Sequence, residues 1–166
     1  QCVPASPNCA VCIFNGRCFA YIHQMQGQLP VKIKKLTVKH RFLNYFIIRQ
    51  GDRLAMHERR GRDIWKGLYD FHLVESAAST ATPDHLTIPD PAFQNLLKKG
   101  RLTEIPKVYS HILTHQRLQV RFWWLEIPET ERIDLPQGMA FYNHEEVEVL
   151  PKPILIDTVL REENYL

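Results

Sequence analysis

The order of hydrophobic and polar positions predicts a β-hairpin in the second quarter of the chain. Residues 42–49 are rich in aromatic and β-branched side chains, which favour strands. A polar turn follows at residues 50–53, and apolar positions return within residues 54–59. Two strand-like segments joined by a short turn that contains glycine are typical of a hairpin.

Three more strands are predicted in the second half of the chain. Residues 107–115 and 116–127 have the composition of strands, and residues 139–142 form a shorter candidate. The continuous apolar run from Phe122 to Leu125 is typical of a strand that is buried on both faces.

Helices are predicted where residues suited to begin and end a helix flank an apolar face. Asp90 is suited to an N-cap, Pro91 to the first helical position, and Gly100 to the helix end. A terminal helix is predicted over residues 153–162 and a short one over residues 19–26. The positions expected to face inward are Phe93, Leu96 and Leu97 in the first helix and Ile154, Leu155, Val159 and Leu160 in the terminal one. Strands combined with a few helices indicate an α+β fold.

Length and composition fit one ordinary domain with an appendage. The chain has 166 residues, of which 45% are hydrophobic, and this content supports a real core. No apolar run reaches the roughly eighteen residues of a membrane helix, and the first residues lack the pattern of a signal peptide. We therefore expect no membrane contact and a cytoplasmic location.

Charge is unevenly distributed along the chain. Residues 1–125 contain 18 Lys or Arg and 8 Asp or Glu, a balance of +10, whereas residues 126–166 contain 3 and 10, a balance of −7. The densest basic run consists of Lys32, Lys34, Lys35, Lys39 and Arg41. This run is either a solvated strand face or a surface that contacts phosphate or another anionic partner.

All four cysteines lie near the start of the chain. Cys2, Cys9, Cys12 and Cys18 have the spacing C-x6-C-x2-C-x5-C, and no cysteine follows. Disulfide frameworks spread their cysteines over a domain, and zinc sites usually join two cysteine pairs across a longer gap. One compact loop of four thiolates suits a 4Fe-4S cluster, which takes one cysteine per iron. Zinc, and disulfides or idle thiols, stay open as alternatives.

This cysteine spacing resembles the cluster loop of the endonuclease-III-like DNA glycosylases. Residues 18–21 and 29–32 are similar to the exit from that loop in MutY-type adenine DNA glycosylases. In that family the loop closes the catalytic domain. The resemblance therefore implies that this chain is a C-terminal part, with the helix-hairpin-helix element and the catalytic carboxylates in a domain that precedes Gln1.

The same resemblance divides the chain into three parts. Residues 1–21 are expected to form the iron–sulfur cluster loop, residues 22–38 a linker, and residues 39–166 a Nudix-like recognition domain. The last assignment uses residues 61–75, which resemble a Nudix-like segment with an aromatic–Gly–Leu–aromatic stretch. The resemblance is carried by Trp65, Gly67, Leu68, Tyr69 and Phe71. Trp65 and Tyr69 are expected to pack in the core or between domains.

The sequence lacks the residues that pyrophosphate hydrolysis requires in that family. The family pattern G-x5-E-x7-R-E-x-x-E-E-x-G supplies carboxylates that hold divalent metal ions. Counted from Gly67, the first Glu position is occupied by Leu73, and residues 76–89 contain no Glu or Arg. Glu75 lies close to that position, but isolated carboxylates cannot hold a metal–diphosphate group. We therefore expect binding rather than hydrolysis.

The candidate recognition residues are Leu113, Thr114 and His115. They match a Phe-Ser-His motif that lies between two strands in MutY-type proteins, where the C-terminal domain helps to read 8-oxoguanine opposite adenine. Leu113 lacks the aromatic face of that motif, whereas Thr114 keeps its hydroxyl. A hydroxyl oxygen can accept a hydrogen bond from the N7–H group of 8-oxoguanine. The alternative is a strand-end turn whose side chains only satisfy backbone groups.

These observations predict the recognition part of an adenine DNA glycosylase that acts in base excision repair. The expected partners are double-stranded DNA with 8-oxoguanine opposite adenine and the catalytic domain. Bacterial-type cytoplasmic action at the nucleoid is expected. Candidate phosphate contacts are Lys32, Lys34, Lys35 and Arg117. A divergent Nudix hydrolase of nucleoside diphosphate compounds and a zinc-stabilised interaction module are the alternatives.

Overall fold

The computed structural model describes residues 2–3, 6–29, 31, 38–79 and 82–166. The chain separates into two compact units, residues 1–37 and residues 38–166, and each is described by itself. The division of the first unit into a cluster loop and a linker stays a prediction. Lys32, Lys34 and Lys35, which were expected to contact phosphate, lie outside the described residues.

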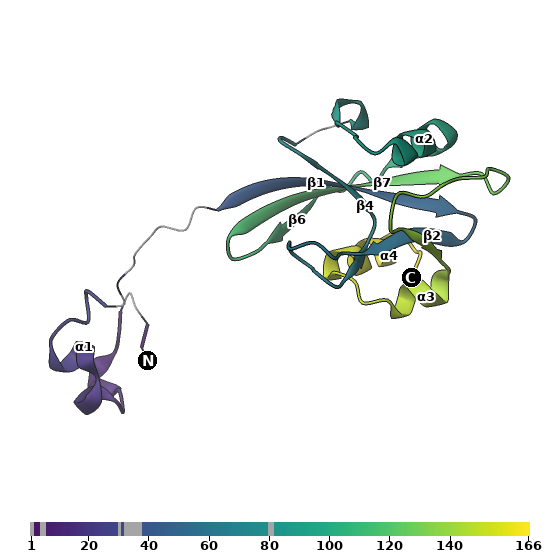
Figure 1. Ribbon diagram of the computed structural model, residues 1–166. Coiled ribbons are helices and arrows are strands. Elements are labelled where there is room, and N and C mark those ends of the chain that lie inside the picture. Colours follow the sequence, from purple (N-terminus) through teal and green to yellow (C-terminus); the bar gives the residue numbers. More distant parts are fainter. Residues whose placement is uncertain (1, 4–5, 30, 32–37, 80–81) are drawn as a thin grey trace. The chain divides into compact units, whose positions relative to one another are not determined.

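A mixed β-sheet forms the centre of the second unit (Figure 1). Its strands are β1 (Lys39–Gln50), β2 (Arg53–Glu58), β3 (Tyr69–Asp70), β4 (His72–Ser76), β5 (Arg101–Glu104), β6 (Tyr109–Ile112), β7 (Gln116–Ile127) and β8 (Ala140–Tyr142). The order β3-β2-β1-β7-β5 runs across the sheet, β4 pairs with β1, β6 with β7, and β8 with β2. The long β1 and β7 pair in parallel, whereas the other pairs are antiparallel. The predicted hairpin is confirmed as β1–β2.

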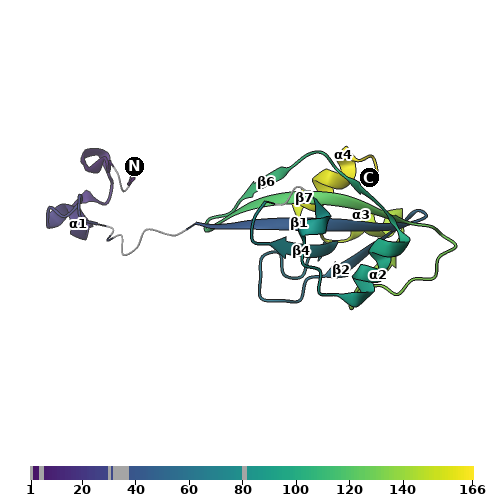
Figure 2. The ribbon, with the colours of Figure 1, turned by 90° about the horizontal axis from the view of Figure 1, so that it is seen from above.

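Helices cover both faces of this sheet (Figures 1 and 2). Helix α2 (Pro91–Lys99) lies on one face, and α3 (His144–Val149) and α4 (Ile154–Glu162) lie on the other. The short 3-10 helix η3 (Pro83–His85) precedes α2. The result is the α+β fold that the sequence predicted.

Two apolar clusters result from the alternation of side chains along β1 and β7. The cluster under α3 and α4 takes Leu43, Tyr45 and Ile47 from β1, whereas the cluster under α2 takes Phe46 and Ile48. Because successive strand residues point to opposite faces, a strand between two helical layers must be apolar throughout. The prediction that the Phe122–Leu125 run is buried on both faces is confirmed, with Trp124 half-buried.

The predicted helix ends are confirmed for α2. The side-chain Oδ1 of Asp90 accepts hydrogen bonds from the backbone N–H groups of Ala92 and Phe93, at 2.9 and 3.3 Å. Pro91 is the first helical residue and Gly100 follows the last. In α4 one predicted inward position is wrong, because Ile154 is 66% exposed while Ile156 is fully buried.

Among its described residues, the first unit contains only short helices. They are η1 (Cys9–Val11), η2 (Asn15–Arg17) and α1 (Phe19–Ile22). The helix predicted over residues 19–26 ends early, and Gln24 adopts a left-handed conformation with φ 57°. In the part of the chain that the structure describes, no helix combines the length and apolar character needed to cross a membrane.

Candidate functional site

The predicted recognition residues lie at the tip of the β6–β7 hairpin. The backbone N–H of Leu113 donates to the carbonyl of Gln116 at 2.8 Å, and the N–H of Gln116 donates back to Leu113 at 3.4 Å. Thr114 and His115 therefore form the turn, and both are exposed. The side chain of Leu113 is half-buried and packs against the core, so it anchors the tip.

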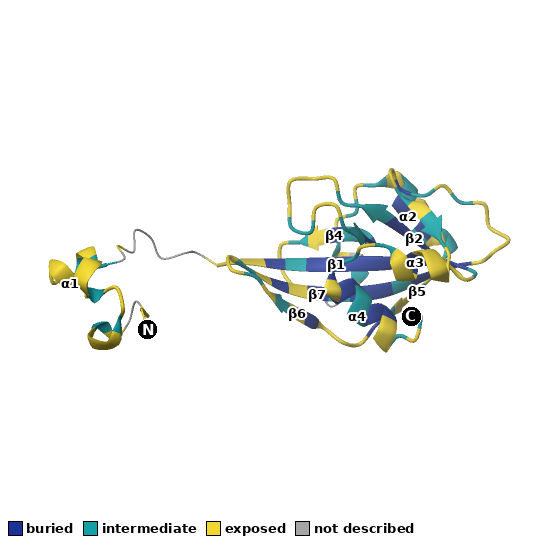
Figure 3. Ribbon diagram, turned by 90° about the horizontal axis from the view of Figure 1, so that it is seen from below, coloured by how far each residue is buried: buried dark blue, intermediate teal, exposed yellow. Residues whose placement is uncertain are grey.

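This tip lies beside the first residues of β1. The backbone N–H of Lys39 donates to the carbonyl of His115 at 2.9 Å. The parallel register sets His40 opposite Arg117, and the side chains of Lys39, His40 and Arg117 are all exposed. Figure 3 shows that burial decreases from the middle of β1 and β7 toward this end of the sheet. The arrangement brings a hydroxyl and basic side chains together on one exposed edge.

Arg41 does not belong to this exposed edge. It was predicted as part of a basic run open to solvent or to phosphate, but it is 7% exposed. Its guanidinium forms bidentate ion pairs with Asp63 and Glu75, with N–O distances of 2.7 to 2.8 Å. The hydrogen bonds from Arg41 hold the pKa of Asp63 at about 2 and lower the pKa of Glu75. Arg41 is therefore committed to the protein.

Neither Glu75 nor helix α2 offers a free carboxylate for phosphate chemistry that uses a metal. Glu75, close to the first family carboxylate position, is paired with Arg41. Helix α2, whose sequence is PAFQNLLKK, has no Asp or Glu. Its last turn carries Lys98 and Lys99 instead. A helix without carboxylates cannot supply the ligands that divalent metal ions need.

A buried carboxylate that the sequence analysis did not single out is linked to Asp63 through Arg59. Asp70 is fully buried, and its Oδ2 accepts hydrogen bonds from the Tyr45 hydroxyl at 2.9 Å and from Arg59 Nη1 at 2.7 Å. Its Oδ1 lies 3.6 Å from Nδ1 of His57, and neither atom has a hydrogen-bond partner within the described residues. Burial raises the pKa of Asp70, although Arg59, His57 and Tyr45 favour its charged form. A single acid in an otherwise ordinary strand gives no sequence signal of this role.

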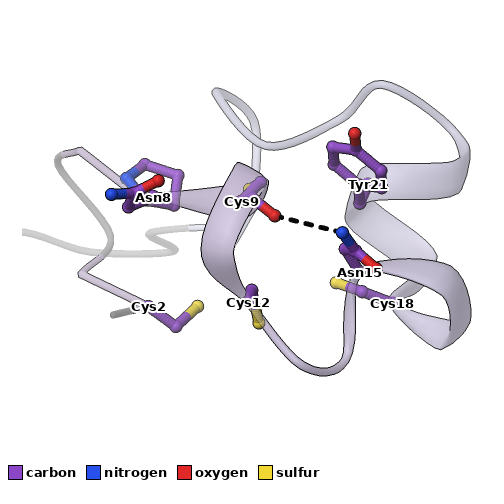
Figure 4. Close-up of a pocket in the computed structure, with 8 residues that line it drawn as sticks. Cys2, Asn8, Cys9, Cys12, Asn15, Cys18 and Tyr21 are labelled. Carbon is purple, nitrogen blue, oxygen red and sulfur yellow. Dashed lines mark hydrogen bonds between the residues drawn. The ribbon is translucent and has the colours of Figure 1, made fainter.

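All four cysteines of the first unit line one cavity of about 30 Å³ (Figure 4). Cys2 is exposed, whereas Cys9, Cys12 and Cys18 are half-buried, and all four are free thiols. The turns are closed by backbone hydrogen bonds from Cys12 to Cys9 and from Cys18 to Asn15, both 3.3 Å long. The side-chain amide of Asn15 also donates to the carbonyl of Cys9 at 3.5 Å. The loop thus turns its cysteines toward a common space.

The electrostatics of this loop reflect the closeness of the thiols. The pKa of Cys9 is raised, first by loss of solvent and then by repulsion from Cys18, Cys12 and Cys2. A positively charged metal centre would reverse this effect, because metal binding deprotonates thiols. Among the described residues, no group of three or more His, Cys, Asp or Glu side chains is positioned to hold a metal ion.

Comparison with known proteins gives a family match and likenesses of fold. A family model described as the NUDIX domain matches residues 44–162. None of the curated proteins matches the chain.

Two solved structures share the fold at low sequence identity. The first is the C-terminal domain of mouse MUTYH, solved in complex with human PCNA. It has a TM-score of 0.55 and 16% identity, and the match covers 75% of this chain and 87% of that one. The second is the NUDIX domain of Shewanella oneidensis NrtR, solved with ADP ribose. It has a TM-score of 0.50 and 7% identity, and the match covers 86% of this chain and 96% of that one.

Proposed function

The chain belongs to the NUDIX domain family, and we propose that it is the lesion-recognition part of an adenine DNA glycosylase. In this proposal it binds duplex DNA that carries 8-oxoguanine opposite adenine, and a separate catalytic domain removes the adenine. The observation that carries the proposal is the β6–β7 tip, where exposed Thr114 and His115 lie beside exposed basic residues. The fold shared with the C-terminal domain of mouse MUTYH supports it.

The chemistry of the tip suits a base that carries a proton on N7. The hydroxyl oxygen of Thr114 would accept a hydrogen bond from N7–H of 8-oxoguanine, whereas N7 of guanine is itself an acceptor. A freely rotating hydroxyl could donate to normal guanine, so selectivity requires its proton to be committed elsewhere. His115 beside it would accept that proton or hold a phosphate. Lys39 and Arg117 would contact the DNA backbone, which positions a protein without reading sequence.

Hydrolysis of nucleoside diphosphate compounds is the alternative for this family. The lack of carboxylates on α2 and the pairing of Glu75 with Arg41 support binding over hydrolysis. Release of phosphate products in the presence of Mg²⁺ would favour the alternative. The mouse domain of the comparison is bound to a protein, PCNA, and we include a protein partner in the proposal on that ground.

The proposal is tested by the affinity of this chain for two duplexes at low salt. One duplex carries 8-oxoguanine opposite adenine and the other guanine opposite adenine. We expect tighter binding to the first. Low salt is required because phosphate contacts weaken steeply as salt rises. Thr114→Ala should reduce the lesion preference by about fivefold, the equivalent of one net hydrogen bond.

Thr114→Ser is the matched control, because it keeps the hydroxyl and should keep the preference. An unchanged ratio of affinities in Thr114→Ala would reject the role of Thr114. Equal affinity of the parent chain for both duplexes would contradict lesion recognition by this chain alone.

In the same proposal, Cys2, Cys9, Cys12 and Cys18 hold a 4Fe-4S cluster. The donor type fits, because such clusters take four thiolates and all four cysteines line one cavity, but the described thiols are not yet gathered as a metal site and would have to close around the cluster. When bound, the cluster would cross-link a loop whose own helices are short, so its contribution would be structural and positional.

Metal analysis of protein purified without oxygen tests this assignment. We expect about four iron atoms and acid-labile sulfide per chain, and a large loss of both in Cys12→Ser. Ala10→Ser is the matched control, because it adds a hydroxyl at an exposed position of the same loop. Zinc without iron or sulfide would instead support the interaction module, and no bound metal would contradict both.

A further inference from the structure

The backbone of the recognition tip is tied to the sheet at two places. Gln116 closes the turn through its hydrogen bonds with Leu113, and His115 accepts a hydrogen bond from Lys39. Both attachments depend on where the first residue of β7 lies relative to the start of β1. A shift of Gln116 would therefore move Thr114 and His115 together.

The side chain of Gln116 accepts a hydrogen bond from the Arg41 guanidinium, which is itself oriented by two carboxylates. The five N–H groups of Arg41 are all used. Nε and Nη2 donate to Glu75 at 2.8 and 2.7 Å, and Nη1 and Nη2 donate to Asp63, both at 2.8 Å. The remaining N–H of Nη1 donates to Oε1 of Gln116 at 3.1 Å. Because two bidentate pairs fix the plane of the guanidinium, its fifth hydrogen bond has a fixed direction.

Asp63 connects the hydrogen-bond cluster around Arg41 to β6, the other strand of the β6–β7 hairpin. It lies in the loop between β2 and β3, which is closed by a hydrogen bond from the N–H of Arg59 to the carbonyl of Leu68 at 2.9 Å. Arg59 Nη2 also donates to Asp63 Oδ2 at 3.1 Å. Two residues after Asp63, Trp65 adopts φ 60°, and its ring packs on the imidazole of His111 in β6 with ring centres 5.8 Å apart.

These contacts connect both β6 and β7 to the buried guanidinium of Arg41. The carboxylates of Asp63 and Glu75 orient Arg41, Arg41 orients Gln116 at the start of β7, and the Asp63 loop supports β6 through Trp65. A left-handed conformation at a bulky residue costs free energy, so surrounding contacts must hold Trp65 in place.

We propose that Gln116 and Arg41 are positioning residues that fix the β6–β7 tip in one orientation for the lesion. The role in lesion recognition, the functional half of this inference, rests on the proposed function of the tip. The structural half, that Gln116 and Arg41 hold the tip in place, does not depend on that function. Gln116 is not proposed to contact a base itself. It acts by limiting where the hydroxyl of Thr114 and the ring of His115 can lie, and loss of its hydrogen bond should loosen the tip while the sheet stays folded.

Amide hydrogen exchange in the 166-residue chain tests the structural half. Gln116→Met removes the acceptor and leaves both carboxylate pairs of Arg41 intact, so no buried charge loses its counterion. We expect the amides of Lys39 and Leu113 to exchange about fivefold faster, the equivalent of one net hydrogen bond. Gln116→Glu should exchange at the parent rate because it keeps an oxygen acceptor for Arg41. Unchanged exchange in Gln116→Met would overturn the proposal.

Arg121→Met is the control for a lost ion pair on the same strand. Arg121 Nη1 pairs with Glu104 Oε1 at 2.6 Å, and Arg121 lies opposite Asn44 of β1, five residues along β7 from Gln116. This variant should leave exchange at Lys39 and Leu113 unchanged. Faster exchange at these amides in Arg121→Met would mean that any loss on β7 loosens the tip, and it would overturn a specific role of Gln116.

The ratio of affinities for the two duplexes tests the functional half. We expect the lesion preference to fall severalfold in Gln116→Met and to persist in Gln116→Glu, even where the added charge weakens binding to both duplexes. A full lesion preference in Gln116→Met would overturn the positioning role. If the parent chain itself shows no preference, the proposed function fails, whereas the exchange rates still decide whether Gln116 holds the tip.

Discussion

Replacement of Asp70 by alanine is expected to destabilise the second unit by about 3–5 kcal/mol. The fully buried carboxylate accepts hydrogen bonds from the hydroxyl of Tyr45 and from Arg59. Its removal leaves the buried hydroxyl without this acceptor and leaves Arg59 with Asp63 as its remaining carboxylate. Removing one partner of a buried charged pair costs more than the pair contributed, because the other charge keeps its desolvation penalty.

Urea unfolding measures this effect, with an unchanged slope indicating that the unfolded state is the same. Asp70→Asn is the matched control, since it keeps the size of the side chain and one oxygen acceptor. We expect it to lose roughly 1–3 kcal/mol. A loss below about 1 kcal/mol in Asp70→Ala would show that Tyr45 and Arg59 find other partners at little cost.

The elements with strong local signals were predictable from the sequence. The β1–β2 hairpin has a strand composition on both sides of a turn at Gly51, where φ is 64°. Helix α2 has its N-cap at Asp90 and ends before Gly100. Local hydrogen bonds and glycine conformations determine these boundaries, and both are visible in a short window of sequence.

Elements that depend on distant partners were less predictable. The four-residue strand β5 was missed, because Arg101–Glu104 is too short and too charged to read as a strand, and its pairing with β7 defines it. The helix α4 was expected, but Ile154 was assigned to the wrong face. Helical spacing fixes which residues share a face, whereas the neighbouring sheet decides which face is buried.

In the candidate site, too, features with a local sequence signal were predictable and features that depend on distant residues were not. Thr114 and His115 were singled out by resemblance to a motif between two strands, and they do form the turn between β6 and β7, while their role in recognition stays a prediction. The cluster of Arg41, Asp63 and Gln116 was not predicted. These residues are far apart in the sequence, and each is of a type that is common on protein surfaces. The proximity of Arg41 and Gln116 follows from the parallel pairing of β1 and β7, for which the sequence carries no local signal.

Acidification from pH 6.5 to pH 4 is expected to destabilise the second unit, because His72 takes up a proton more readily in the unfolded chain. The full effect on the free energy of unfolding is about 3 kcal/mol. The imidazole stacks on Phe93, with ring centres 3.9 Å apart, and lies 6.5 Å from the ring of Phe46. The pKa of His72 is lowered to about 4, first of all by burial; Asp90 opposes the shift, and His57 adds to it. The folded chain therefore keeps this ring neutral where the unfolded chain is already protonated.

The sign of this effect follows from proton uptake. Because the folded pKa lies below the ordinary value of about 6.5, the unfolded state binds more protons between the two values, and stability falls as the pH falls. His72→Phe preserves an aromatic contact with Phe93 and removes the titration. The difference in unfolding free energy between parent and variant should change with a slope approaching roughly 1.4 kcal/mol per pH unit near pH 5.

Taking the difference between the two proteins isolates His72 from the other acid-sensitive groups. Asp63 and Glu75, whose pKa values are lowered by Arg41, lose their contribution as the pH falls toward 2, but they do so equally in parent and variant. A difference that stays constant between pH 6.5 and pH 4 would show that the folded chain protonates His72 as readily as the unfolded one. The ring would then have to leave Phe93 and reach solvent without disrupting the layer under α2, which the stacked geometry argues against.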